Sequence, residues 1–172
     1  MNKLETFEQK AYDQNVKVYD YYLGEESLAG LYIDGRVAIN TSVKSLKKRT
    51  CVIAEELGHH YTSSGNILDQ DDVRTQKQEH KARLWGYNES IGLIGIVEAF
   101  NHGCHNLYEM AEYLDVTEEY LKEALDAYRD KYGVRTDIDN YTVCFIPYLT
   151  VFKKVYFFIL ILLLITIYIL LI

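Results

Sequence analysis

Proline, glycine and cysteine are scarce in this chain of 172 residues, and each shortage excludes a class of protein. A single proline and ten glycines exclude collagen-like chains and proline-rich disordered chains. The three cysteines, Cys51, Cys104 and Cys144, cannot all pair within the chain and form no C-x-x-C motif. We therefore expect a reducing, cytosolic environment and a fold that does not depend on disulfides.

Positive charge is also in short supply. Lysine and arginine number 18 against 25 aspartates and glutamates, which gives a formal net charge of -7. Broad binding to nucleic acid or to anionic lipid requires a basic surface, so the composition argues against both. The N-terminal residues 1–14 lack the apolar stretch of a secretory signal, and none is predicted.

One long hydrophobic run stands apart at the C-terminal end. Residues 155–172 contain no charge and directly follow Lys153 and Lys154. As a helix they would span about 27 Å, close to a bilayer core of about 30 Å, and the lysines favour a cytoplasmic domain. We therefore predict a folded domain over residues 1–152 and a transmembrane tail over residues 153–172. Two alternatives stay open: a buried strand or helix, and an extension unrelated to the folded domain.

The pattern of the body predicts an α+β fold that is mostly helical, with a small antiparallel sheet. Asp34-Gly35 separates two β-prone runs, which is typical of a hairpin. Helical periodicity predicts helices over residues 3–23, 45–62, about 69–87 and 89–100, and a helix pair within 110–132. A last strand is predicted within residues 141–151, ending near Pro147. In the second helix, the side chains expected to face the core are Leu46, Val52, Ile53, Ala54 and Leu57.

The stretch V-I-A-E-E-L-G-H-H-Y, residues 52–61, carries the chemistry of the chain. On a helix, Glu55 and His59 share one face at the spacing of the two histidines in zinc-binding H-E-x-x-H helices. Glu56 holds the position of the catalytic glutamate in that motif. Because zinc accepts carboxylate oxygen as well as imidazole nitrogen, we predict Glu55 and His59 as metal ligands and Glu56 as general base. The alternative is a solvated helix face, since an E-x-x-x-H pair is much less specific than H-E-x-x-H.

Several segments of the chain carry one family likeness. They are Leu28–Asn40, Cys51–Thr62, Gly65-Asn66, Glu79–Tyr87, Glu109–Leu121 and Asp139–Tyr141. Together they resemble the ImmA/IrrE family of metallopeptidases, most of all the branch carried by prophages and integrative elements of Gram-positive bacteria. The resemblance implies a zincin-like domain and a zinc-dependent endopeptidase. It implies as substrate a helix-turn-helix repressor of the mobile element, which is cleaved or otherwise inactivated.

Two positions depart from the pattern of that family. The leading ligand is Glu55 where the family has histidine. The family's downstream ligand is usually a glutamate directly before an alanine, whereas here Lys81 precedes Ala82 and the acid lies earlier, at Glu79. We predict Glu79 as the third zinc ligand, and its rivals are Asp69, Asp71 and Asp72.

Two further clusters have less specific patterns. The stretch His102-Gly103-Cys104-His105 lacks the second half of a zinc motif and is interpreted as the end of a helix. Residues 106–131 contain three bases and eight acids, which argues against DNA binding and favours a packed helix pair or a docking surface for a basic partner. A DNA-binding repressor would be such a partner. The alternative to an enzyme is a non-catalytic, metal-free interaction module of the anti-repressor or toxin–antitoxin type.

Overall fold

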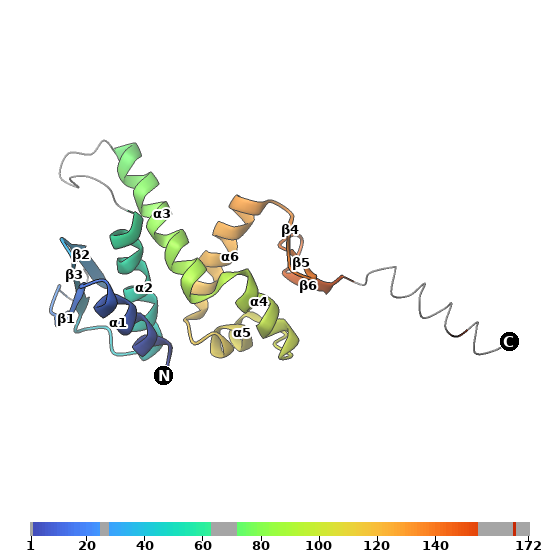
Figure 1. Ribbon diagram of the computed structural model, residues 1–172, viewed down its shortest axis with the longest axis horizontal. Coiled ribbons are helices and arrows are strands. Elements are labelled where there is room, and N and C mark those ends of the chain that lie inside the picture. The colour runs from blue at the N-terminus through green and yellow to red at the C-terminus, as the bar shows by residue number, and fades with distance from the viewer. Residues whose placement is uncertain (1, 25–27, 63–71, 155–166, 168–172) are drawn as a thin grey trace. The chain divides into compact units, whose positions relative to one another are not determined.

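The computed structural model describes residues 2–24, 28–62, 72–154 and 167, and these form a mostly helical α+β structure with small sheets (Figure 1). The predicted fold class is confirmed at that level. The chain divides into two compact units, Met1–Ala127 and Tyr128–Ile172. The helices are α1 (Lys3–Asp13), α2 (Leu46–Thr62), α3 (Asp72–Ser90), α4 (Gly92–Asn101), α5 (Leu107–Tyr113) and α6 (Glu118–Tyr132). The strands are β1 (Lys17–Tyr21), β2 (Gly30–Ile33), β3 (Arg36–Asn40), β4 (Arg135–Ile138), β5 (Tyr141–Cys144) and β6 (Thr150–Lys153).

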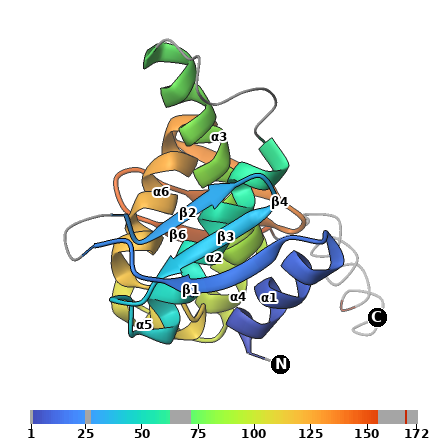
Figure 2. The same cartoon turned by 90° about the vertical axis from the view of Figure 1, so that its left-hand side faces the viewer.

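The first sheet has the strand order β1-β3-β2 and lies across helix α2 (Figure 2). Strands β2 and β3 form the predicted hairpin, in which Ile33 pairs with Arg36 across the loop Asp34-Gly35. Both loop residues have positive φ, 45° and 76°, as a tight two-residue turn requires. The hairpin prediction is confirmed, and it leaves β2 as an edge strand that pairs on one side only.

The helix predicted over residues 3–23 is wrong in its second half. Helix α1 begins at a capping box, in which the Asn2 side chain accepts a hydrogen bond from the Glu5 N–H and the Glu5 carboxylate accepts one from the Asn2 N–H. It ends at Asp13, because Asn15 takes the left-handed conformation with φ 56° and turns the chain. Residues 17–21 then form β1, which pairs in parallel with β3.

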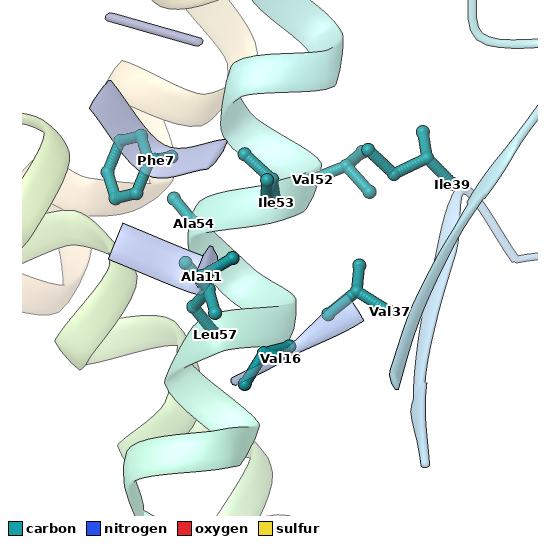
Figure 3. Close-up of a cluster of buried hydrophobic side chains, with 9 residues drawn as sticks. All are labelled: Phe7, Ala11, Val16, Val37, Ile39, Val52, Ile53, Ala54 and Leu57. Atoms are coloured by element: carbon teal, nitrogen blue, oxygen red, sulfur yellow. The ribbon is translucent and has the colours of Figure 1, made fainter. Parts of the chain in front are cut away.

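The hydrophobic core of the first unit lies between α1, α2 and the inner face of the sheet (Figure 3). Its members are Phe7, Ala11, Val16, Val37, Ile39, Val52, Ile53, Ala54 and Leu57. The predicted apolar stripe of α2 is therefore confirmed except at Leu46, whose side chain is 64% exposed. Leu46 is the first residue of α2, about one turn before the buried run begins at Thr50.

The described part of the second unit contains the end of α6 and an antiparallel sheet with the order β4-β5-β6. The strand predicted within residues 141–151 is present as β5, which ends at Cys144, before Pro147. The chain then turns around Pro147 into β6, a further strand that was not predicted. The aromatic rings of Tyr128 and Tyr132 pack near Phe145, which joins helix and sheet.

The predicted hydrophobic tail lies outside the described residues, apart from Lys153, Lys154 and Ile167. Strand β6 includes Lys153, the first residue of the predicted tail. Over the part of the chain that the structure describes, no helix has both the length and the apolar character needed to cross a membrane.

Candidate active site

A pocket of about 390 Å³ lies between strand β2 and the two packed helices α2 and α3. It gathers the four side chains for which the sequence predicts a catalytic or metal-binding role: Glu55, Glu56, His59 and Glu79. Arg83 of α3 and residues 28–32 also line this pocket. Two larger hollows beside strand β1 contain no histidine in their described linings.

Helix α2 presents Glu55, Glu56 and His59 to this pocket, while Ile53, Ala54 and Leu57 belong to the core. Glu55 and His59 are one helical turn apart, and their side chains are 29% and 22% exposed. Glu56 is different, because it is only 9% exposed and is one of few buried polar residues among those described. The solvated-face alternative therefore does not describe Glu56.

Gly58, in the middle of the motif, lets helix α3 approach helix α2. A Cβ atom at this position would lie 2.1 Å from the backbone oxygen of Ala82, so no larger residue fits without movement of the helices. Because α3 runs this close, it brings Glu79 to α2. The Glu79 Oε2 atom lies 3.3 Å from the His59 Nε2 atom.

Arg83 is a member of the pocket that the sequence analysis missed. Its Nε atom lies 2.9 Å from the Glu79 Oε1 atom and 3.0 Å from the Glu55 Oε1 atom. One guanidinium therefore bridges carboxylates on two helices. The spacing of Glu79 and Arg83, four residues apart on one helix, was the signal available in the sequence.

Glu56 lies against the edge strand β2. Its carboxylate accepts a hydrogen bond from the backbone N–H of Tyr32. Gly30, on the same strand, is needed for this approach, since a Cβ there would lie 2.8 Å from the Glu56 Oε1 atom. The Tyr32 hydroxyl is 2.8 Å from the His60 Nδ1 atom, which adds a second link between β2 and α2.

Burial controls the protonation of the pocket. It raises the pKa of the Glu56 carboxyl to about 8, and the charges of Glu55 and Glu79 add to the rise while the Tyr32 N–H opposes it. Burial also raises the pKa of Glu55, against the lowering effect of the Arg83 charge. Burial lowers the pKa of His59 in spite of the nearby Glu79 charge, which keeps the imidazole neutral at pH 7.

The other metal candidates have different outcomes. Asp69 and Asp71 lie outside the described residues, and Asp72 is the first residue of α3. The cluster at residues 102–105 ends helix α4, as predicted, with Gly103 at a positive φ of 92°. The Cys104 thiol donates to the Glu109 carbonyl at 3.5 Å, so its contact is structural.

The donor chemistry of the pocket fits zinc, but its carboxylates already hold a cation. Two carboxylates and a neutral imidazole are ligands that zinc accepts. Among the described residues, no three histidine, cysteine or acidic side chains stand close enough to form a ready-made metal site. The guanidinium of Arg83 lies within 3.0 Å of both Glu55 and Glu79.

Comparison with known proteins gives no relative. No family model, no curated protein and no solved structure matches this chain.

Proposed function

We propose that the chain is a zinc-dependent endopeptidase of the ImmA/IrrE type, with a zincin-like fold, that cleaves or otherwise inactivates a helix-turn-helix repressor of a mobile element. One observation carries the proposal. His59 and Glu79 come from two different helices and meet at 3.3 Å in the pocket that also contains Glu55 and Glu56. Glu55, His59 and Glu79 would hold the zinc, which would act as a Lewis acid on the scissile carbonyl.

Glu56 is suited to act as the general base. In the metal-free chain a pKa of about 8 leaves the Glu56 carboxyl mostly protonated at pH 7, and the positive charge of a bound zinc would lower that pKa toward the range in which a general base accepts a proton. The Tyr32 N–H fixes one side of the carboxylate, and Val52 and Gly30 close in on it from α2 and β2. The side chain is therefore held in one place beside the candidate ligands.

The edge strand β2 offers a way to align a peptide substrate. The two-residue hairpin loop makes Ile33 and Arg36 a hydrogen-bonded pair, so the alternation of an antiparallel ladder turns Gly30 and Tyr32 toward the open edge. An extended peptide can add to such an edge as a further strand. The Tyr32 N–H on this edge is engaged with Glu56, so a peptide that pairs with the remaining edge groups would lie beside the general base.

The partner that we propose is a basic, DNA-binding repressor. The α5–α6 region is strongly acidic, with three bases and eight acids between residues 106 and 131. Some of these acids pair internally, as Glu119 does with Lys48 at 3.6 Å, and others such as Glu118 are exposed. Charge of this sign steers a basic partner and repels nucleic acid. We also propose that residues 155–172 anchor the domain to the cytoplasmic face of a membrane.

A second function has one observation in its favour. Arg83 bridges Glu55 and Glu79 as a metal ion would, so these two carboxylates have a cationic partner without metal. A metal-free module that binds a repressor or antitoxin without cutting it is consistent with that arrangement.

The two functions are separated by one set of measurements on the full-length chain. Bound zinc is measured, and the protein is incubated with the helix-turn-helix repressor encoded beside it. We expect zinc and cleavage in the wild type, zinc without cleavage in Glu56→Gln, and neither in His59→Ala. His102→Ala and Glu98→Gln are matched controls outside the pocket and should behave as the wild type. A metal-free protein that binds the repressor and leaves it whole would establish the second function and refute the first.

A further inference from the structure

We propose that Arg83 is a built-in cation that occupies the position between Glu55 and Glu79 when no metal is bound, so that zinc binding is an exchange of one cation for another. The inference rests on the proposed zinc site and adds its regulation. The zinc affinity of the site then depends on whether the Arg83 guanidinium is held between the two glutamates or released from them.

Arg83 binds the same carboxylate oxygen atoms that a metal ion would use. Arg83 Nε binds the Oε1 atoms of both glutamates, at 2.9 and 3.0 Å. The remaining oxygen of Glu79, Oε2, faces His59 Nε2 at 3.3 Å. A metal that took both carboxylates together with His59 would occupy the space that the guanidinium fills.

The charge balance of the pocket favours one cation over two. Within the described lining of the pocket, three carboxylates face one arginine and no lysine. Arginine keeps its charge at every ordinary pH, so it cannot leave by losing a proton. A dication beside a retained guanidinium would be repelled by it at a separation of a few ångströms.

The Arg83 side chain is exposed enough to leave the pocket. The Arg83 side chain is 46% exposed, and its partners Glu55 and Glu79 are 29% and 40% exposed. Ion pairs this close to solvent contribute little free energy, so the guanidinium can turn outward into water at low cost. The long aliphatic part of arginine lets the charge move while the helix stays in place.

A purely local role does not account for both contacts. An i, i+4 pair of Glu79 and Arg83 stabilises an isolated helix only slightly and needs no third residue. The bond to Glu55 crosses from α3 to α2 and lies inside the pocket. Arg49 also forms an ion pair, with Asp20 at 2.6 Å, but that pair lies outside this pocket. Arg49 is therefore a control for the loss of an arginine ion pair.

The test is a zinc titration of the full-length chain by competition with a chromophoric chelator. We expect Arg83→Gln to bind zinc at least tenfold more tightly than the wild type. Arg83→Lys keeps the charge and should stay within about threefold of the wild type, and Arg49→Gln should not change the affinity. A second readout needs no variant: the Nε–Hε NMR signal of Arg83 should shift with zinc, saturating at the same dissociation constant.

The outcomes distinguish this inference from the function on which it rests. Equal zinc affinity in wild type and Arg83→Gln, or weaker binding by the variant, overturns the exchange while the zinc site stands. An Arg83 signal that zinc leaves unchanged overturns it too, even if Arg83→Gln does not fold. If no variant binds zinc, both the zinc site and the exchange are refuted.

Discussion

Gly58 lies at the contact between α2 and α3, and replacing it by alanine tests whether that contact builds the candidate site. A Cβ atom at position 58 would be 2.1 Å from the backbone oxygen of Ala82, whereas ordinary contact begins at 3.4 Å. A backbone oxygen cannot swing aside as the end of a side chain can. The helices must therefore separate locally by about 1.3 Å.

Two effects of opposite sign decide how much Gly58→Ala changes the free energy of unfolding. Replacing a glycine inside a helix by alanine stabilises the helix by about 1 kcal/mol. Overpacking destabilises by about 1–3 kcal/mol and occasionally by more, and a clash with backbone belongs at the upper end of that range. We expect a net loss of about 2 kcal/mol in the free energy of unfolding. Because α3 carries Glu79, we also expect weaker zinc binding.

Urea unfolding of the full-length chain, followed by circular dichroism, measures the first effect. Gly95→Ala is the matched control in helix α4, because its Cβ would meet only the flexible end of Leu114, at 3.0 Å. Gly86→Ala should fall between the two, since its Cβ would lie 3.0 Å from the Ala54 backbone oxygen. A Gly58→Ala variant as stable as the wild type, or more stable, would refute the claim that this glycine sets the helix contact.

Three further predictions follow from the pocket and the tail. In metal-free protein, the folded state keeps a proton on Glu56 that the unfolded chain loses above its ordinary pKa of 4.5, so stability falls between about pH 4.5 and 8. Glu56→Gln should not show this fall, so its free energy of unfolding should gain about 2–4 kcal/mol relative to that of the wild type between pH 5 and pH 8. Parallel pH profiles of unfolding in the two proteins would contradict the raised pKa. Gly30→Ala should lose about 1–3 kcal/mol in urea unfolding, because its Cβ would lie 2.5 Å from Val52 Cγ1, and the added change Val52→Ala should restore part of the loss; no rescue would show that the clash is not the cause. Membrane fractionation should find the full-length chain in the pellet and a chain lacking residues 155–172 in the supernatant, whereas equal solubility would exclude anchoring.

Local signals were enough to predict some elements. The hairpin of β2 and β3 follows from Asp34-Gly35, whose two residues suit the positive φ of the turn. Helix α2 follows from its apolar spacing. Strand β1 was missed because it is stabilised by parallel pairing with β3, about twenty residues away, and no pattern within residues 17–21 records that partner. The exposure of Leu46 was missed because periodicity does not say where the neighbouring sheet ends.

The site was predictable to the extent that it lies on one helix. The spacing of Glu55 and His59 requires only helical geometry. The contact of Glu79 with His59 depends on the close approach of α3 at Gly58, which a period of 3.6 residues does not reveal. Arg83 was missed for the same reason, because its bond to Glu55 exists only once the two helices are packed.

The burial of Glu56 bears on the choice between an enzyme and a surface helix. A carboxyl that is 9% exposed, beside two other glutamates, is unfavourable enough to raise its pKa to about 8. A glutamine or a leucine on this face would avoid that penalty, so packing alone gives no reason for the acid. Carboxylates held together in a pocket require a cation, and the two candidates are the guanidinium of Arg83 and a metal ion. The proposed enzyme and the proposed interaction module therefore differ in which cation these acids hold during function, and the amount of zinc bound by the wild-type chain measures that difference.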